Sequence, residues 1–567
     1  MTTPSLDTAR AVLEELAGAG MRHLVVAPGS RSAPLAYAAA AAAAAGALEV
    51  HVRVDERGAG FTALGIARAT GRPAGVLTTS GSAVGNLLPA VMEADHAEVP
   101  LVVVSADRPP ELRGTGANQT TRQPGIFGGH VRAVVDLLPG DDDVPARLAG
   151  ALAALAGRAG DGPRPAGPVQ LNVALREPLH PAPEDGPVLA AWAGRLAGRR
   201  PGDPGPGPRA VAAGPVHGPG PQAWCSRAVV VAGDGAGPEA ARFAEECGLP
   251  LLAEPSSNAR TGPHAVGAYR LLLGTALGGQ VERVLLAGRP TLSRPVAALL
   301  ARADVLTAAV QPLPVAWYEP GRRRERVLRS WAEASAFTGR GAPGWLAQWQ
   351  ERGAAADAAV AGVLAEDPLC GPAAAALVWD ACRRDGSVLV AGSSNPVRDL
   401  DLAAVPGPTA PLVLANRGLA GIDGTLATAT GAALGADRAV RAFVGDLTFL
   451  HDASSLLLGT GEREPDLQVV VLNDGGGGIF TTLEHGAVGE QAEYRATVER
   501  FFGTPHEARL EALCAGYGVA HHRAADLAAL QRALAGPVRG RSVVEVPADR
   551  RDLRALHARL RSAVAGR

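Results

Sequence analysis

Two apolar segments that end in acidic residues and glycines constrain the fold of this chain more than any other feature. The first predicts a buried strand that ends in Gly445 and Asp446, and the second predicts a strand that ends in Asn473, Asp474 and a run of four glycines. The two aspartates are 28 residues apart, which suits a strand–helix–strand unit whose strand ends lie side by side. Ligands bind at that carboxyl edge in open α/β sheets. The sequence therefore predicts a parallel sheet with a binding site at this edge.

The residue types at these strand ends suit a metal ion that also contacts phosphate. Mg²⁺ prefers hard oxygen ligands in octahedral geometry. Asp446 and Asp474 can each supply one carboxylate oxygen, the carbonyl of Gly476 a third, and a diphosphate with water the rest. Neighbouring glycines let backbone N–H groups approach phosphate closely. Two alternatives stay open: Asn473 as the ligand in place of Asp474, and two glycine-rich turns with acidic caps that bind nothing.

Strand and helix signals alternate along the whole chain, which is typical of parallel sheets covered by helices. A stretch crowded with proline and glycine near residue 200 predicts a linker. We therefore predict an α/β protein with three doubly wound parallel-sheet domains. The predicted bounds are 1–182 for the first domain, 183–226 for the linker, 227–345 for the middle domain, and 346–567 for a connecting helix with the third domain.

Composition excludes several classes of protein. The net charge of −2 offers no broad basic surface for nucleic acid. All 54 basic residues are arginine, so no lysine can form a Schiff base or complete a P-loop. The five cysteines are scattered, which fits a reducing cytoplasm rather than a disulfide framework. The longest apolar run has about 13 residues, fewer than the roughly 20 of a membrane span. With no signal-peptide pattern at the N-terminus, we expect a cytoplasmic protein.

Nine short motifs occur in order along the first and third predicted domains. They occupy residues 27–35, 55–60, 79–84, 106–112, 116–119, 123–125, 415–418, 421–424 and 477–480. Together they resemble the 2-succinyl-5-enolpyruvyl-6-hydroxy-3-cyclohexene-1-carboxylate synthase family of thiamine-diphosphate enzymes. The similarity is weak in the middle domain. The resemblance implies that the first domain binds the aminopyrimidine of the cofactor and that the third binds its diphosphate.

The resemblance also implies the cofactor contacts: thiamine diphosphate held through Mg²⁺, with Mn²⁺ as an alternative. Asp446, Asp474 and Gly476 would ligate the metal. Glu56 would place a buried carboxyl against the aminopyrimidine and so promote loss of the C2 proton, although alone it reads as an acid at a helix N-terminus. Ile422 would hold the cofactor bent. The full set of implied cofactor contacts is Glu56, Ser394, Ile422, Gly445, Gly477, Ile479, Phe480 and Leu483.

The reaction that the resemblance implies belongs to menaquinone biosynthesis. 2-Oxoglutarate loses CO₂, and the resulting carbanion adds in 1,4 fashion to isochorismate. Each substrate carries two carboxylates, which arginine binds in bidentate fashion. The implied substrate contacts are Ser30, Arg31, Arg108, Asn118, Gln119, Arg294, Ser394, Arg398 and Arg417, of which Arg31, Arg108, Gln119, Arg398 and Arg417 would join Glu56 in catalysis. For Arg294 a surface ion pair is an equal alternative.

Two other functions are compatible with part of this pattern. Another thiamine-diphosphate-dependent 2-oxoacid decarboxylase or carboligase, such as an acetohydroxyacid-synthase-like enzyme, acts on small monoacids and needs fewer cations. A non-catalytic scaffold needs neither Glu56 nor Asp446. These two residues are 390 positions apart and must meet on one cofactor. The resemblance implies that they meet across a subunit interface, so we expect a homodimer or homotetramer.

Overall fold

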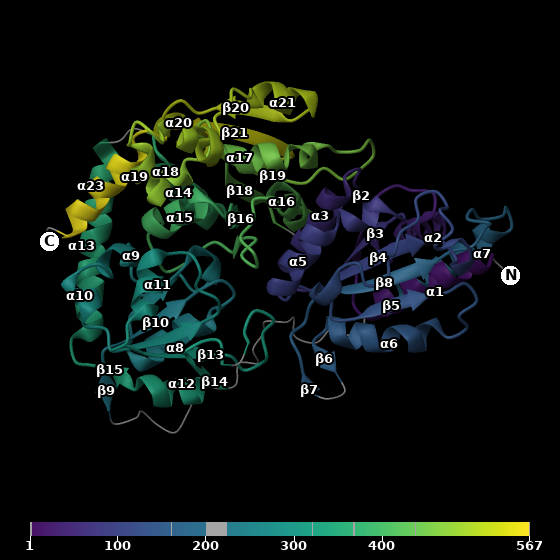
Figure 1. Cartoon of the computed structure of the whole chain (residues 1–567), viewed down its shortest axis with the longest axis horizontal. Helices are drawn as coiled ribbons and strands as arrows, with labels where there is room; N and C mark the ends of the chain where they lie inside the picture. Colours follow the sequence, from purple (N-terminus) through teal and green to yellow (C-terminus); the bar gives the residue numbers. More distant parts are fainter. Residues whose placement is uncertain are drawn as a thin grey trace.

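The computed structural model describes residues 3–159, 162–199, 224–319, 321–366, 369–436 and 438–565. Three parallel sheets with helices on their faces dominate the architecture (Figure 1). Two of them have six strands and one has five. This arrangement confirms the predicted fold class of three doubly wound parallel-sheet units.

The first sheet has the strand order β2-β1-β3-β4-β8-β5, and all its strand pairs are parallel. Its strands are β1 (His23–Val26), β2 (Glu49–Val52), β3 (Ala74–Thr78), β4 (Leu101–Asp107), β5 (Val134–Leu137) and β8 (Val169–Ala174). Around it lie α1 (Pro4–Gly18), α2 (Ala33–Ala44), α3 (Glu56–Thr70), α4 (Ser82–Gly85), α5 (Leu88–His96), α6 (Val144–Leu155) and α7 (Asp185–Gly198). Short 3-10 turns η1 (Pro110–Leu112) and η2 (Gly128–His130) and the hairpin β6 (Arg158–Ala159) and β7 (Gly162–Pro163) complete it.

The middle sheet has the order β11-β10-β12-β13-β14, again with parallel pairs. Its strands are β10 (Ala228–Ala232), β11 (Leu251–Ala253), β12 (Arg283–Ala287), β13 (Leu306–Val310) and β14 (Arg326–Leu328), beside a small parallel pair of β9 (Cys225–Ser226) and β15 (Arg340–Gly341). The helices are α8 (Glu239–Cys247), η3 (Pro255–Ser257), α9 (Tyr269–Leu272), α10 (Ala276–Gly279), α11 (Arg294–Ala301), α12 (Trp331–Thr338) and α13 (Trp345–Glu366).

The third sheet has the order β17-β16-β18-β19-β21-β20. Its strands are β16 (Val388–Ala391), β17 (Val413–Leu414), β18 (Val440–Gly445), β19 (Leu467–Asn473), β20 (Ala520–Arg523) and β21 (Arg541–Pro547). Its helices are α14 (Gly371–Asp385), α15 (Asn395–Ala403), α16 (Thr425–Gly435), α17 (Asp446–His451), η4 (Ala453–Leu456), α18 (Ile479–Thr482), α19 (Glu484–Gly489), α20 (Arg495–Val498), the π-helical η5 (Glu499–Gly503), α21 (Leu510–Gly516), α22 (Leu527–Ala535) and α23 (Leu553–Ala565).

The two strands that the sequence singled out are parallel neighbours. β18 pairs with β19 so that Gly445 stands opposite Leu472, which brings the ends of both strands to one edge of the sheet. Both strands are buried on both faces, which explains their nearly continuous apolar sequences. The predicted strand–helix–strand unit is therefore confirmed.

Part of the predicted linker is a helix. α7 begins at Asp185 and packs against α2, with Leu189, Trp192 and Leu196 in the core of the first domain. Residues 200–223 of the predicted linker lie outside the described residues. No single helix within the described ranges is long and apolar enough to cross a membrane; α13 and α14 pass that test only as a pair bent by 115°.

The first and third sheets are joined where α3 crosses α16. A Cβ atom at Gly65 of α3 would lie 2.1 Å from the carbonyl oxygen of Thr428. One at Gly431 of α16 would lie 2.0 Å from the carbonyl oxygen of Thr62. The backbones of the two helices therefore touch, and glycine is required at the crossing because any side chain would push the helices apart.

Replacing Gly65 with alanine tests this crossing. We expect Gly65→Ala to destabilise the protein by about 2 kcal/mol or more, because a backbone carbonyl cannot move aside as a side chain can. The matched control is Gly150→Ala, in an exposed position of α6 with no atom within 4 Å of the added Cβ. This control should stabilise the protein by about 0.5–1 kcal/mol. Thermal unfolding of both variants is the measurement, and equal midpoints would contradict the crossing.

Candidate active site

A cavity of about 460 Å³ lies at the carboxyl edge of the third sheet. Its walls come from the ends of β16, β18 and β19, from the loops that follow these strands and β17, and from two residues of the middle domain. The structure thus brings together many of the predicted site residues on one surface. Those that line the cavity are Ser394, Arg398, Arg417, Ile422, Gly445, Asp446, Asp474, Gly476, Gly477, Ile479 and Phe480.

Asp446 and Asp474 are the two carboxylates among the described residues that line this cavity. Asp446 accepts hydrogen bonds from the backbone N–H of Leu447 at 2.6 Å and of Gly476 at 2.8 Å. Burial nevertheless raises its pKa above the ordinary value. Burial and the nearby charge of Asp446 raise the pKa of Asp474 to about 7. The Oδ1 atom of Asp474 is buried without a hydrogen-bond partner among the described residues. Two crowded carboxylates and an unpaired buried oxygen fit a bound cation.

Asn473 faces another part of the structure. Its Nδ2 atom donates to Glu545 Oε1 at 2.7 Å, and its side-chain oxygen accepts the N–H of Gly475. Asn473 is absent from the described walls of the cavity, whereas Asp474 is among them. The geometry thus favours Asp474 over Asn473 as a metal ligand.

In the glycine run, backbone without side chains lines the cavity together with the two carboxylates. Gly476 has φ +147°, and a Cβ atom there would lie 2.0 Å from Arg550 Nη1 and 2.2 Å from the carbonyl oxygen of Gly503. At Gly445, by contrast, an added Cβ would meet no atom within 4 Å. A bare strand end next to two carboxylates gives room for phosphate oxygens to reach backbone N–H groups.

Among the described residues, three arginines also line the cavity: Arg289, Arg398 and Arg417. Arg417 is 3% exposed, and its Nη2 atom donates to Thr291 Oγ1 at 2.9 Å. Its Nε and Nη1 atoms are buried and have no partner among the described residues. Arg398 donates through Nη1 to the carbonyl oxygens of Ser393 and Ser394, and burial followed by the charge of Arg417 lowers its pKa. Unpaired guanidinium N–H groups in a cavity fit a carboxylate ligand.

A second group of predicted residues gathers in the first domain. Arg108 donates to Ser80 Oγ at 2.8 Å and to the carbonyl oxygen of Asn118 at 2.9 Å. Gln119 donates to the carbonyl oxygen of Ser80. Burial and the charge of Arg108 lower the pKa of Arg31, which places these two cations close together. Ser30 is exposed next to Arg31.

Glu56 belongs to this first-domain half of the site. It is the first residue of α3, is only half-buried, and accepts a hydrogen bond from Asn86 Nδ2 at 3.2 Å. The expected burial of its carboxyl is therefore not reached within one chain. Neither Glu56 nor the residues grouped around Ser80 are among the described walls of the third-domain cavity.

Arg294 and Leu483 lie in an adjoining cavity of about 470 Å³, which shares Arg398 and Ile479 with the first one. The side chain of Arg294 is 63% exposed and pairs with Glu484 at 2.7 Å. This is the surface ion pair that remained the alternative for Arg294, and such a pair contributes little to stability.

Three residues near the cavity were missed by the sequence reasoning. Arg289 and Thr291 of the middle domain line it, and His506 Nε2 lies 3.0 Å from Asp446 Oδ2. Arg289 and Thr291 follow directly after β12, so their place at the carboxyl end of a parallel strand was the available signal. His506 follows no strand, and no local pattern marks it.

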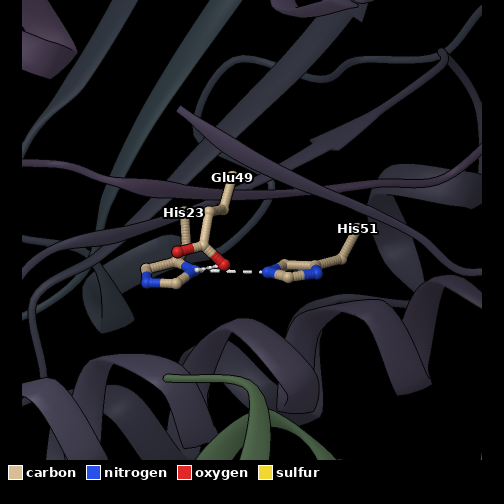
Figure 2. Close-up of side chains that lie close together, drawn as sticks. All are labelled: His23, Glu49 and His51. Carbon is tan, nitrogen blue, oxygen red and sulfur yellow. Dashed lines mark hydrogen bonds and ion pairs between the residues drawn. The ribbon is translucent and has the colours of Figure 1, made fainter. Parts of the chain in front are cut away.

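Outside this site, two histidines and a glutamate, which are residue types that commonly bind metal ions, also lie close together. His23 and His51 lie on neighbouring strands with Glu49, and Figure 2 shows the three side chains together. The facing ring nitrogens are 3.2 Å apart. Burial lowers the pKa of both rings, that of His51 to about 3, so one neutral ring donates to the other. Arg463 already pairs with Glu49 at 3.1 Å. These contacts describe a hydrogen-bonded pair that a metal ion would have to break.

Comparison with known proteins agrees with this geometry. The family model for the thiamine pyrophosphate enzyme N-terminal TPP binding domain matches residues 6–126. A 2-succinyl-5-enolpyruvyl-6-hydroxy-3-cyclohexene-1-carboxylate synthase of Paenarthrobacter aurescens (strain TC1) is 55% identical, over 99% of this chain and 97% of its own. The proteins of the same name from Arthrobacter sp. (strain FB24) and Kineococcus radiotolerans are 54% and 49% identical, over 99% of this chain and 92% and 99% of their own.

The fold, the site and the matched N-terminal domain define a thiamine-diphosphate-dependent enzyme. The similarity extends over nearly the whole chain, including the middle domain where the motifs were weak. The chain belongs to the 2-succinyl-5-enolpyruvyl-6-hydroxy-3-cyclohexene-1-carboxylate synthase family. The resemblance drawn from the nine motifs is thereby confirmed, and the acetohydroxyacid-synthase-like alternative gains no support.

The raised pKa of Asp474 predicts a measurable stability effect. The folded pKa of about 7 lies above the ordinary value of 3.8, so ionisation of this group opposes folding. The destabilisation is absent below about pH 4, grows as the pH rises, and is complete above about pH 7. We expect Asp474→Asn to stabilise the metal- and cofactor-free protein by about 1–2 kcal/mol at pH 8, and by less at pH 5.

Thermal unfolding in the presence of a chelator at both pH values is the measurement. The control is Asp549→Asn, because Arg551 lowers the pKa of Asp549 to about 2 and removing that charge should not stabilise the protein at pH 8. An Asp474→Asn variant that is less stable than the parent at pH 8 would contradict the prediction.

Proposed function

We propose that this chain carries out the synthase reaction of its family: decarboxylation of 2-oxoglutarate and 1,4-addition of the resulting carbanion to isochorismate, with release of CO₂, in menaquinone biosynthesis. The observation that carries the proposal is a single cavity that is lined both by two crowded carboxylates and by Arg417, whose buried Nε and Nη1 atoms have no partner among the described residues. The carboxylates suit a metal ion with diphosphate, and the arginines suit dicarboxylate substrates.

The residues present fit the cofactor and its metal. Asp446, Asp474 and the carbonyl of Gly476 would hold Mg²⁺ or Mn²⁺, as hard oxygen donors do. Bound there, thiamine diphosphate supplies the electron sink for decarboxylation. Gly445 and Gly477 offer bare backbone to its diphosphate, while Ile422 stands in the cavity wall where an apolar side chain can hold the cofactor bent.

The remaining cofactor and substrate roles follow from the two groups of side chains. We assign Arg398 and Ser394 to the carboxylate of the 2-oxoglutarate-derived arm, and Ile479, Phe480 and Leu483 to the apolar wall. The isochorismate contacts are Ser30, Arg31, Arg108, Asn118, Gln119, Arg294 and Arg417. Glu56 would hold the aminopyrimidine and promote loss of the C2 proton. Of these, Arg294 has the weakest structural support, because its side chain is exposed and already paired.

Two chains would build each active site. The first-domain group around Glu56 and the third-domain cavity hold complementary halves of the required chemistry, yet the described residues of one chain do not place them on one surface. A second copy would bring its first domain to this cavity and bury Glu56, giving a homodimer or a homotetramer. The first, middle and third sheets would be the pyrimidine-binding, middle and diphosphate-binding domains. The five scattered cysteines suit a cytoplasmic enzyme.

The direct test is the reaction itself. With thiamine diphosphate, Mg²⁺ and 2-oxoglutarate present, we expect the absorbance of isochorismate to fall at a rate that depends on all three. Removing the metal with a chelator should abolish the reaction, and Mg²⁺ or Mn²⁺ should restore it, because the diphosphate is held through the metal. A folded protein that consumes no isochorismate under these conditions would refute the proposed reaction.

Complementation tests the shared site. Glu56→Gln and Asp446→Asn should each lower activity at least about a hundredfold. Co-expressed, the two variants should recover about one quarter of the parent activity, because half of the randomly formed dimers contain one intact site out of two. The control pair is Asp446→Asn with Asp474→Ala, which removes the side-chain oxygen; both lie in the same half, so this pair should recover nothing. Recovery by neither pair would contradict the two-chain site.

A further inference from the structure

The short segment that carries Arg417 is held by charged side chains of the other two domains. Residues 415–419 follow β17 and reach the cavity through Arg417. Arg68 of α3 donates to the carbonyl oxygen of Ala415. Arg289, from the middle domain, donates to the carbonyl oxygen of Gly418 at 2.6 Å.

Glu93 holds this segment most directly. It lies on α5 of the first domain and is 3% exposed. Its Oε1 atom accepts the backbone N–H of Gly418 at 2.8 Å, and its Oε2 atom accepts that of Leu419 at 2.7 Å. One carboxylate therefore fixes two consecutive amides directly after Arg417, as oriented N–H donors hold an anion.

The packing at this contact leaves no room for a side chain at Gly418. A Cβ atom at Gly418 would lie 2.7 Å from the carbonyl oxygen of Glu93 and 2.9 Å from its carboxylate. The N–H of Arg417 donates to the carbonyl oxygen of Ala415 at 2.8 Å, so the backbone turns tightly at the arginine. Glycine is needed here because the Glu93 carboxylate approaches the backbone itself.

The charge of Glu93 depends on the contacts it makes. Burial raises its pKa to about 7, while Arg68 and the two amides act in the opposite direction. The Nη1 atom of Arg68 lies 3.8 Å from Glu93 Oε1, and its Nη2 atom lies 3.6 Å from Asp234 of the middle domain. Buried charges persist when they are paired and hydrogen-bonded. The ionised carboxylate of Glu93 is therefore stabilised in part by Arg68 and in part by the two amides of the Arg417 segment.

We propose that Glu93 is a positioning residue, which sets the direction of the Arg417 guanidinium by clamping the Gly418 and Leu419 amides. This inference rests on the proposed function, because it assumes that Arg417 binds isochorismate. Only the Nη2 atom of Arg417 has a hydrogen-bond partner among the described residues, namely Thr291 Oγ1. The direction of the guanidinium therefore depends on the backbone that carries it.

The test is Glu93→Gln in the full-length enzyme loaded with thiamine diphosphate and Mg²⁺. Glutamine has the same shape but offers one acceptor oxygen, and its NH₂ group opposes the second amide. We expect the KM for isochorismate to rise about tenfold, as the loss of one charge-assisted hydrogen bond predicts. The KM for 2-oxoglutarate and single-turnover release of radiolabelled CO₂ from it should stay within about twofold, because neither needs the Arg417 segment held by Glu93. Glu93→Asp, which keeps the charge on a shorter arm, should be intermediate.

The matched control is Glu98→Gln. Glu98 follows the same helix and is buried, and its Oε1 atom accepts the N–H of Ala316 at 3.0 Å. It joins the first domain to the middle one through Ala316, so its variant should leave the KM for isochorismate within about twofold. A rise as large as that of Glu93→Gln would mean that any weakening of the domain junction suffices, and would overturn the inference.

Arg417→Ala separates failure of this inference from failure of the proposed function. If Arg417→Ala raises the KM for isochorismate and Glu93→Gln adds less than about twofold to it, the two residues act through one another, as proposed. If Arg417→Ala has this effect and Glu93→Gln has none, the positioning role is wrong while the binding role of Arg417 stands. If Arg417→Ala leaves the KM unchanged, the assignment of Arg417 is wrong and the positioning role fails with it. A Glu93→Gln variant that slows CO₂ release and isochorismate use equally has only a structural role.

Discussion

The crossing of α3 and α16 is the contact on which the arrangement of the two halves of the site depends. Gly65 and Gly431 let the two backbones touch, so the first and third sheets are held at one fixed distance. Contacts at the start of α3 extend this junction: Arg57 donates to the carbonyl oxygen of His451, and Asp55 accepts from Ser454. Glu56 is therefore fixed on a rigid helix end yet stays half-buried in one chain. A site that a second subunit completes requires such an arrangement: a carboxyl on a firmly held helix end that one chain leaves partly uncovered.

The third-domain half of the site could be predicted because its signals are local. Asp446 and Asp474 end apolar runs of strand length, and parallel pairing alone brings strand ends together. Arg289 also follows a strand end, but pairing within one sheet does not show that the edge of the middle sheet meets the cavity of the third. Glu93 could not be found in this way, because it reaches residues 415–419 from a helix of the first domain. α7 was missed for a different reason. Its composition resembles the proline- and glycine-rich stretch that follows, although the helical spacing of Leu189, Trp192 and Leu196 was the available signal.

Unfavourable ionisation of two buried carboxylates distinguishes the candidate site from the rest of the chain. Burial and mutual repulsion raise the pKa of Asp474, and burial raises that of Asp446, in a cavity where one carboxylate oxygen has no described partner. Such an arrangement opposes folding as long as no positive charge compensates the two carboxylates. Sites that break a local rule of stability in this way are commonly functional. The histidine pair of β1 and β2 is the contrast, because its two neutral rings satisfy each other and need no ligand.

The absence of lysine from the chain bears on how its buried cations work. Around residues 415–419, three arginines converge from three domains: Arg68, Arg289 and Arg417. Burial lowers the pKa of Arg289, yet a guanidinium is so strongly basic that it remains charged, whereas a buried ammonium loses its proton more readily. Each guanidinium also divides its N–H groups between partners, as Arg68 does between a carbonyl and two carboxylates. Arginine can therefore hold a backbone segment with some of its N–H groups and offer others to a ligand. Arg68 and Arg289 hold the backbone of residues 415–419, and this backbone positions the Arg417 N–H groups that we assign to the substrate.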